Sequence, residues 1–251
     1  MKNILLITFA LLTVTFSFAR IQEDSLNVSD TLKVKLETTS SLAFATRNVW
    51  RGISFGDSPS LQGLMNFNYC KLNIGAFGVV TSNGTRVGYG NTLEMYASYD
   101  ILDNLSLTID DYYFFNSHDS LDNYFEYGSG TQHYIEAQAR YLWKESVEIL
   151  IGYNIYSSSI DNTDGVYIQT TVFINDNISV FTGFLTGSSY LNFMDKRGVT
   201  NVGITTIKKL SLKEFSSVLS TSLILSPNHI NIADVPGVGT SPVYFVASLT
   251  F

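Results

Sequence analysis

The sequence consists largely of runs in which apolar and polar residues alternate, and this periodicity limits most of the chain to β-structure. Each run has about ten residues and ends in turn-forming residues, which is the pattern of a membrane-spanning β-barrel. We therefore predict an all-β fold, a single antiparallel transmembrane β-barrel of about twelve strands. The predicted strands are 39–51, 59–70, 72–81, 91–101, 105–116, 133–143, 147–157, 165–175, 178–187, 199–209, 216–226 and 241–251.

The predicted connections alternate in length, which favours a barrel over a soluble β-sandwich. Even-numbered connections are brief, as at Cys70-Lys71 and Asn175–Asn177, and odd-numbered ones are long, as at Ser117–Gln132 and Pro227–Thr240. Outer-membrane barrels have short periplasmic turns and longer external loops. With an even number of strands, both ends of the barrel segment are expected on the periplasmic side.

Within single runs the two faces differ in chemistry. In 133–143, Ile135 and Ala137 share one face, and Glu136 and Arg140 share the other. Because successive side chains point to opposite sides of a barrel wall, the apolar set is expected to face lipid and the polar set to line the lumen.

Adjacent carboxylates at Asp110 and Asp111 conflict with this parity. Asp110 is expected inside, so a regular strand would turn Asp111 towards lipid, a costly placement near the middle of a bilayer. A β-bulge, or a position close to the rim of the barrel, would resolve the conflict.

The first residues have the order of a signal peptide. Residues 4–19 carry no charge, and Ser17-Phe18-Ala19 supplies the small residues of a cleavage site before Arg20. We predict a cleaved signal peptide at 1–19, a polar N-terminal segment at 20–31 and the barrel at 32–251. No later run reaches the ~18 apolar residues of a membrane-spanning helix, so any spanning structure must be a closed barrel.

Composition agrees with a barrel and narrows the possible partners. Charged residues make up 15% of the chain, against roughly 25% in a typical soluble domain. The net charge of −7 excludes the basic surface of a nucleic-acid-binding protein. Cys70 is the only cysteine, so the chain has neither an internal disulfide nor a paired-cysteine metal or redox site.

The inward-facing charged residues are the best guide to function. Parity places these candidates for the lumen or its constriction: Arg47, Arg51, Glu94, Asp100, Asp110, Glu136, Arg140 and Glu148. Charged side chains inside a barrel either line an aqueous path or pair with one another and close it. We expect a narrow porin-like channel for small polar solutes. The alternative is a non-conducting structural or adhesive barrel that acts through its external loops.

Arg47 and Arg51 are predicted on the lumen side of the first strand, where they should face carboxylates of the middle strands. The leading partners are Glu94, Glu136 and Glu148. Opposed charges would form a constriction, and charge in a narrow pore is screened less than surface charge, so the arginines are expected to influence ion selectivity. The alternative is an ion pair between Arg51 and Asp57 at the rim.

Aromatic residues near strand ends suggest how the barrel sits in a membrane. Trp50, at the external end of the first predicted strand, and Trp143, at the periplasmic end of the sixth, are candidates for aromatic girdles. The last strand alternates apolar residues up to a terminal phenylalanine, through Phe245, Leu249 and Phe251. This ending resembles the C-terminal signal that the barrel-assembly machinery reads.

Histidines in or beside the predicted external loops raise the question of catalysis, because outer-membrane proteases and lipases place catalytic residues at this level. These are His118, His133 and His229. No serine has a recognisable nucleophile setting, and a metal site of His118 with Asp119 and Asp122 has only a generic spacing. We predict no catalytic residue, no metal and no cofactor, and keep a loop-sited enzyme as the least favoured alternative.

Several segments carry a resemblance to a known family. They are Val49–Ser54, Pro59, Gln62-Gly63, Leu93–Tyr99, Tyr112-Tyr113 and Tyr134–Ala137. The Trp-Arg-Gly-Ile-Ser piece in particular resembles the N-terminal signature of the TorF-type porin family, over about the first half of the mature chain. The resemblance implies an exported outer-membrane channel of poorly defined activity, and it supplies no catalytic residue or ligand.

The expected location is therefore the outer membrane, reached through the signal peptide. The expected partners are outer-membrane lipid, the barrel-assembly machinery and a small polar solute, with no nucleic acid.

Overall fold

The computed structural model describes residues 36–56, 58–82, 90–115, 124–128, 132–157, 165–189, 191–212, 215–228, 238–239 and 241–251. Strands and turns make up these residues, and they include no helix able to cross a membrane. The predicted signal peptide at 1–19 and polar segment at 20–31 lie outside the described ranges.

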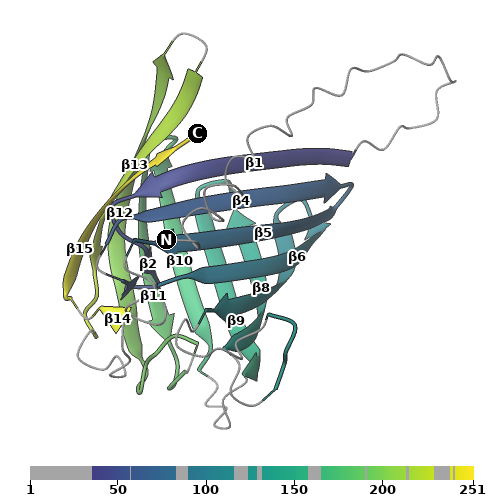
Figure 1. Ribbon diagram of the computed structural model, residues 1–251, viewed down its shortest axis with the longest axis vertical. Coiled ribbons are helices and arrows are strands. Elements are labelled where there is room, and N and C mark those ends of the chain that lie inside the picture. The colour runs from purple at the N-terminus through teal and green to yellow at the C-terminus, as the bar shows by residue number, and fades with distance from the viewer. Residues whose placement is uncertain are drawn as a thin grey trace, which may run out of the picture. The chain divides into compact units, whose positions relative to one another are not determined.

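Twelve strands close into one antiparallel barrel (Figure 1). The wall strands are β1 (Leu36–Ala45), β4 (Ser60–Tyr69), β5 (Leu72–Thr81), β6 (Thr92–Leu102), β7 (Leu105–Phe114), β8 (His133–Trp143), β9 (Val147–Ser157), β10 (Tyr167–Asn175), β11 (Ile178–Leu185), β12 (Gly198–Leu212), β13 (Phe215–Leu225) and β15 (Val243–Thr250). The predicted all-β antiparallel barrel is confirmed, and most predicted strand ends lie close to the observed ones.

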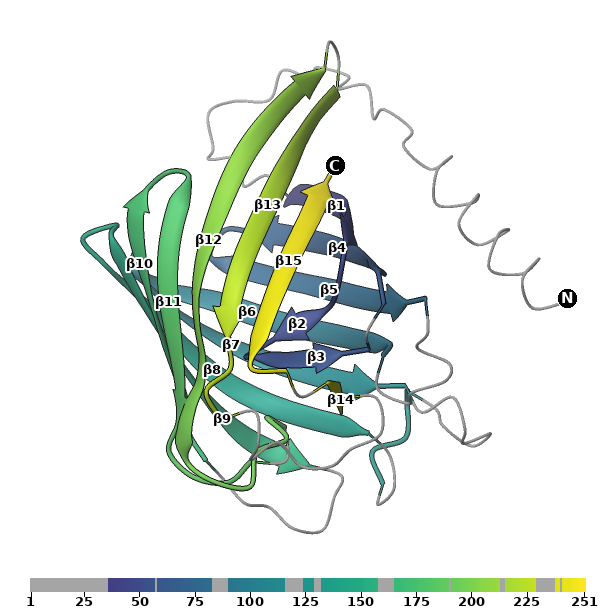
Figure 2. The same ribbon diagram turned by 90° about the vertical axis from the view of Figure 1, so that its left-hand side faces the viewer.

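The first predicted strand, 39–51, is wrong at both ends. β1 ends at Ala45, and the chain then leaves the wall. It forms β2 (Val49–Trp50) and β3 (Ile53–Phe55) before it returns to the wall as β4. β2 and β3 join β14 (Val238–Gly239) in a three-stranded sheet that lies inside the ring of wall strands (Figure 2).

The connections at the two ends of the barrel differ in length, as predicted. At one end, which we call the short-turn end, the wall strands are joined by tight turns such as Cys70-Lys71. At the other, the long-connection end, the segments are much longer, including the one that carries β2 and β3.

Burial follows strand parity around the wall. In β6, Met95 and Tyr99 are exposed on the outside, whereas Glu94 and Tyr96 are half-buried on the inside. Large apolar residues are exposed all around the outer face, among them Phe67, Ile74, Ile109, Ile151, Ile174, Ile204 and Leu223. An apolar surface of this extent is unusual for a soluble protein and suits contact with lipid.

Asp111 faces outward, and its carboxylate is contacted by His133 and by two tyrosines of the described segment 124–128. Its Oδ1 lies 2.9 Å from His133 Nδ1, and its Oδ2 accepts hydrogen bonds from the Tyr124 and Tyr127 hydroxyls at 3.2 and 2.6 Å. Burial and the Asp111 carboxylate raise the pKa of both tyrosines above the usual range, which keeps them protonated as donors. β7 pairs with β8 in unbroken register here, so a bulge is not the explanation.

The barrel closes at a seam between β1 and β15. Their register aligns only Ala43–Ala45 with Ser248–Thr250, and backbone hydrogen bonds between Leu42 and Phe251 extend it slightly. On its other side, β1 is aligned with β4 over the whole of Leu36–Ala45. The seam is therefore much shorter than the neighbouring strand pairing.

Candidate functional site

The candidate site is the barrel lumen, and it is organised by the hairpin of β2 and β3. The pairing of these strands leaves Arg51 and Gly52 as a two-residue turn. Both residues have positive φ, 51° and 82°, as a type I′ hairpin turn requires. A Cβ at Gly52 would collide with the carbonyl oxygen of Thr200 in β12. The sequence therefore permits a tight turn close to the wall, with Arg51 at its tip.

Arg51 forms a buried ion pair with Glu136 of β8. Its Nη1 donates to Glu136 Oε1 at 2.8 Å and its Nη2 donates to Oε2 at 2.6 Å, so the pairing is bidentate. The side chains are only 5% and 1% exposed. Glu136 lies over Gly152 of β9, where a Cβ would stand 2.6 Å from its Oε1. A glycine in the neighbouring strand thus makes room for the carboxylate.

The rest of the Arg51 guanidinium is also enclosed. It lies between two aromatic rings, with its Cζ 4.3 Å from the centroid of Trp50 and 3.9 Å from that of Tyr167. Its Nη1 also donates to Asn192 Oδ1 at 2.9 Å. Cation–π contacts of this kind are strongest where water is excluded. The hairpin tip is therefore held by charge, hydrogen bonds and aromatic faces together.

An apolar core fills the lumen around the hairpin at the long-connection end. Phe55 stacks on Phe114 with ring centroids 5.4 Å apart and meets Phe193 edge-on at 5.6 Å. The members of this core are Ile53, Phe55, Tyr112, Phe114, Tyr134, Tyr167, Leu185, Leu191, Phe193 and Met194, with Trp50 and Leu150 packed against them. We call this set the lumen core, and it makes this end of the lumen apolar.

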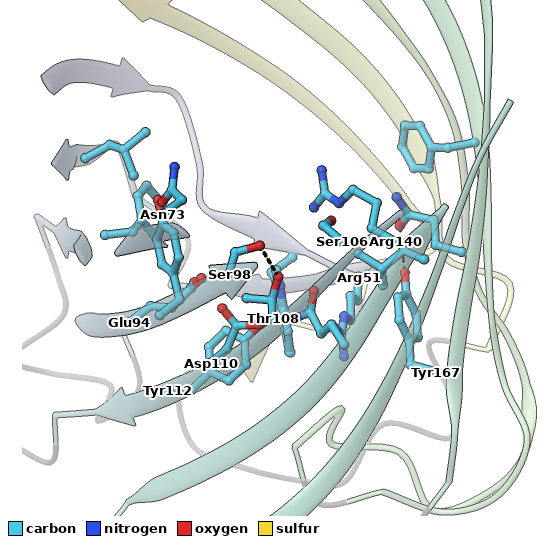
Figure 3. Close-up of a pocket in the computed structure, with 18 of the residues that line it drawn as sticks. Arg51, Asn73, Glu94, Ser98, Ser106, Thr108, Asp110, Tyr112, Arg140 and Tyr167 are labelled. Atoms are coloured by element: carbon cyan, nitrogen blue, oxygen red, sulfur yellow. Dashed lines mark hydrogen bonds between the residues drawn. The ribbon is translucent and has the colours of Figure 1, made fainter. Parts of the chain in front are cut away.

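Beyond the hairpin the lumen opens into a cavity of about 710 Å³ that extends to the turn Cys70-Lys71 at the short-turn end. Its lining is rich in polar and charged side chains, several of which Figure 3 shows together: Arg51, Asn73, Glu94, Ser98, Ser106, Thr108, Asp110, Tyr112, Arg140 and Tyr167. We call this space the lumen cavity. Its size falls within the usual range for small-molecule sites.

Hydrogen bonds connect neighbouring strands along the cavity wall. Thr108 Oγ1 donates to Ser98 Oγ at 2.9 Å (Figure 3). Gln138 Nε2 donates to the Tyr112 hydroxyl at 3.0 Å and to Glu136 Oε2 at 2.8 Å. The second amide contact ties the polar wall to the buried ion pair.

The predicted arginine positions need correction, because neither residue belongs to the first wall strand. Arg51 reaches the lumen from the inner hairpin and meets Glu136, one of its three expected partners. Arg47 follows β1, and its Cζ lies 5.7 Å from the ring centroid of Tyr244 in β15. Asp57, the alternative partner for Arg51, lies outside the described residues.

Most other predicted lumen residues lie on the inner wall. Glu94, Asp100, Asp110 and Arg140 line the lumen cavity. Glu148 accepts a hydrogen bond from Arg140 Nη1 at 3.4 Å.

The two girdle candidates differ in their placement. Trp50 is wrong as an outer girdle residue, because it lies in β2 with its ring 5.4 Å from that of Tyr112, inside the barrel. Trp143 is exposed at the short-turn end of β8, so its girdle role stays a prediction.

The C-terminal residues lie at the end of the seam. Phe245 and Phe251 are exposed, and Leu249 is half-buried. Phe251 meets Phe44 of β1 edge-on, with ring centroids 6.4 Å apart. Their role in assembly stays a prediction.

Several residues of the site had no counterpart in the sequence-based prediction. Leu191, Asn192 and Phe193 come from the long connection after β11, which turns inward and supplies a hydrogen bond to Arg51 and part of the lumen core. The leucine and the phenylalanine were a signal in the sequence, because large apolar side chains favour buried positions over an exposed loop. For the hairpin, the signal was a glycine-containing dipeptide, Arg51-Gly52, placed between two short segments of residues that favour β-strands.

The histidines and a metal site were the sequence-based candidates for reaction chemistry. His133 has both ring nitrogens engaged, by Asp111 and by the Tyr124 carbonyl oxygen at 2.8 Å. No group of three metal-binding side chains occurs within the described ranges. His118, His229, Asp119 and Asp122 lie outside them. What the lumen itself offers is charge, hydrogen bonds and aromatic faces, which are the means of binding small polar solutes.

A closed twelve-strand antiparallel barrel with an apolar outer face and a lumen cavity rich in polar and charged side chains fits the outer-membrane β-barrel class of proteins. Comparison of the sequence with protein-family models and with curated proteins finds no significant match. Function therefore has to be argued from the lumen itself.

Proposed function

We propose that the protein is an outer-membrane channel for small polar solutes, with the lumen cavity as the solute pathway and the hairpin of β2 and β3 as its constriction. The observation that carries the proposal is the charge-lined cavity of about 710 Å³ between Arg51 and the turn Cys70-Lys71. A barrel that served only as a scaffold would be more stable with this space filled by apolar side chains. The polar lining suits a hydrated solute.

The outer-membrane location is part of the proposal. It is supported by the apolar outer face, by the predicted signal peptide at 1–19 and by the resemblance of Val49–Ser54 to the TorF-type porins. The hairpin narrows the lumen, so passage requires it to move. We expect rare, small openings in the native protein.

Conductance of the purified protein in planar bilayers tests the proposal. We expect ohmic steps in the native protein and more frequent or larger steps in Glu136→Ala, because this substitution removes the carboxylate that holds Arg51. Arg47→Ala together with Arg51→Ala should shift the reversal potential in a salt gradient towards cations. Silence of the native protein and of all these variants, across voltages and salts, would refute the channel.

The second candidate is a non-conducting barrel that acts through its long connections, and the lumen core is the observation that favours it. Its apolar residues occupy the long-connection end, where a permanently open pore would be lined by water. Bilayer silence in Glu136→Ala, with the barrel shown to be folded, would favour this candidate.

Orientation can be tested in whole cells. We expect position 129, in a long connection, to face the outside and position 146, in a short turn, to face the periplasm. Single cysteines at Ser129 and Ser146 in a Cys70→Ser background would be exposed to a membrane-impermeant thiol reagent. Labelling of position 146 alone would invert the proposed orientation.

A further inference from the structure

Three carboxylates are neighbours on the inner wall of the barrel, and Arg51 bonds to one of them. Asp110 in β7 stands opposite Glu136 in β8, and Glu136 binds Arg51 through both oxygens. Glu94 in β6 faces the same space, with its carboxyl group within hydrogen-bonding reach of that of Asp110. We call Glu94 and Asp110 the carboxylate pair. It lies beside an ion pair that is already complete.

Asp110 has an oxygen that a ligand could satisfy. The residue is 3% exposed, yet its Oδ2 has no hydrogen-bond partner among the residues that the structure describes. An unsatisfied buried carboxylate oxygen is costly, so such atoms call for a donor. Asp110 lines the lumen cavity together with Glu94, so the carboxylate pair stands in the cavity wall (Figure 3).

The surroundings of the carboxylate pair favour an organic cation. Glu94 stands opposite Phe77 of β5 on one side and Tyr112 of β7 on the other, and both aromatic residues line the lumen cavity, as does Tyr96. Aromatic faces attract organic cations. A metal ion would require several oxygen ligands. Both oxygens of Glu136 are already bound to Arg51, and in the described ranges no three such side chains are placed so that they could hold a metal ion.

We propose that the carboxylate pair binds the primary ammonium group of a small organic solute inside the lumen cavity. A primary ammonium has three N–H donors, which can serve Asp110 Oδ2 and the Glu94 carboxylate at once. Its charge offsets theirs, and its carbon chain lies against Phe77 and Tyr96. The inference rests on the proposed function for the solute's route, but binding can be measured without passage.

The test is a calorimetric titration of the purified, detergent-solubilised barrel with n-butylammonium. Two probes separate charge from hydrogen bonding: n-butanol keeps the chain and lacks the charge, while tetramethylammonium keeps the charge and lacks N–H donors. We expect n-butylammonium to bind at least about tenfold more tightly than either, as charge-assisted hydrogen bonds predict. Equal binding of tetramethylammonium or of sodium ions would overturn the assignment to primary ammonium groups.

Variants locate the site. Asp110→Asn and Glu94→Gln should each weaken n-butylammonium binding by about tenfold or more, since each removes a charged acceptor. Asp103→Asn is the matched control, because it removes the same charge from the exposed turn between β6 and β7. Glu94→Gln also covers the case in which Asp110→Asn fails to fold. If both variants bind as the native protein does, or if the native protein binds no n-butylammonium because the two carboxyl groups share a proton, the proposal is wrong.

Failure of this inference is distinguishable from failure of the channel. If the barrel conducts in bilayers but does not bind n-butylammonium, the channel proposal stands and the assignment of the solute class is wrong. If the barrel binds n-butylammonium but shows no conductance in bilayers, the binding site stands and the channel proposal is wrong.

Discussion

Among the residues that the structure describes, two ion pairs join lumen residues, one at each end of the cavity, and they differ in geometry and in burial. Arg51 and Glu136 form a bidentate pair, with nitrogen–oxygen distances of 2.6 and 2.8 Å, and both side chains are almost fully buried. Arg140 and Glu148 meet at a single contact of 3.4 Å, and the Arg140 side chain is 53% exposed. The first pair stands beside the lumen core and the second in the open part of the lumen.

The difference shows how surroundings set the role of a charged pair. In a dry site, removing one partner leaves an uncompensated buried charge, so the pair fixes the position of whatever segment carries it. In a wet site, water and ions screen the same charges, and the pair adds little stability. The barrel therefore uses one pair to hold its hairpin and leaves the other exposed to water.

The largest effect should follow from Glu136→Ala, which leaves the Arg51 guanidinium buried without a carboxylate. Breaking one side of a buried ion pair costs about 3–5 kcal/mol, so the hairpin should detach at a lower urea concentration. Because Trp50 and Trp143 are the only tryptophans, a Trp143→Phe background leaves a single fluorophore in the hairpin. Urea titration of Trp50 fluorescence in lipid vesicles is the measurement.

The control for this prediction is the double variant Arg51→Met with Glu136→Leu. Replacing both members of a buried pair by apolar residues of similar size is often neutral or stabilising, so most of the lost stability should return. A Glu136→Ala midpoint equal to that of the native protein would mean that the ion pair does not hold the hairpin.

The second-largest effect is expected in the lumen core, which lies beside the buried ion pair. Ile53→Ala removes a side chain that is 1% exposed in the lumen core and should cost about 2–4 kcal/mol by leaving a cavity. Leu64→Ala is the matched control, since Leu64 lines the lumen cavity, where water can replace the lost atoms; we expect about 1 kcal/mol or less. Equal losses of unfolding free energy for the two variants in the same urea titration would contradict the distinction between an apolar end and a hydrated end of the lumen.

The third test moves to the outer face of the long-connection end. His133→Ala removes a donor from Asp111 but leaves the Tyr124 and Tyr127 hydroxyls, so a loss of about 1–2 kcal/mol is expected. Thermal unfolding of the barrel, followed by the change in its gel mobility, measures this loss. Tyr127→Phe should cost less, because that ring is exposed. A native-like melting temperature for His133→Ala would show that the outward carboxylate does not need the histidine.

The smallest effect is expected for Arg140→Ala at the short-turn end. An exposed ion pair contributes about 0–1 kcal/mol, and added salt should reduce even that. The measurement is the same urea titration at low and high salt, with Trp143 as the fluorophore in a Trp50→Phe background. A loss as large as that of Glu136→Ala would abolish the contrast between the two pairs.

The wall of the barrel was predictable because its rules are local. Alternation decides which side chains face outward, and turn residues such as Cys70-Lys71 decide where a strand ends. Both signals can be read within about ten residues, the length of a spanning strand. The same parity predicted an inward face for Glu94, Asp110 and Glu136; Glu94 and Asp110 line the lumen cavity, and Glu136 binds Arg51 of the inner hairpin.

The hairpin was not predictable by the same rules. Arg47, Val49 and Arg51 continue the alternation of β1, so parity alone cannot mark the end of the strand at Ala45. The turn at Arg51-Gly52 adopts positive φ, which a non-glycine residue such as Arg51 adopts at a cost. Contacts with Glu136 and Asn192, far away in the sequence, offset that cost, and no local pattern encodes them.

The short seam has a consequence for the order in which the barrel assembles. All other neighbouring wall strands are consecutive along the chain, but the seam joins β1 to β15, which lie almost the whole length of the barrel segment apart. Contacts of such long sequence separation form slowly, because chain entropy is lost before any contact is gained. With only Ala43–Ala45 in register with Ser248–Thr250, the seam is also where opening should begin. A chain that lacked Val243–Phe251 would leave β1 and β13 with free edges, and such edges pair readily with strands of other molecules.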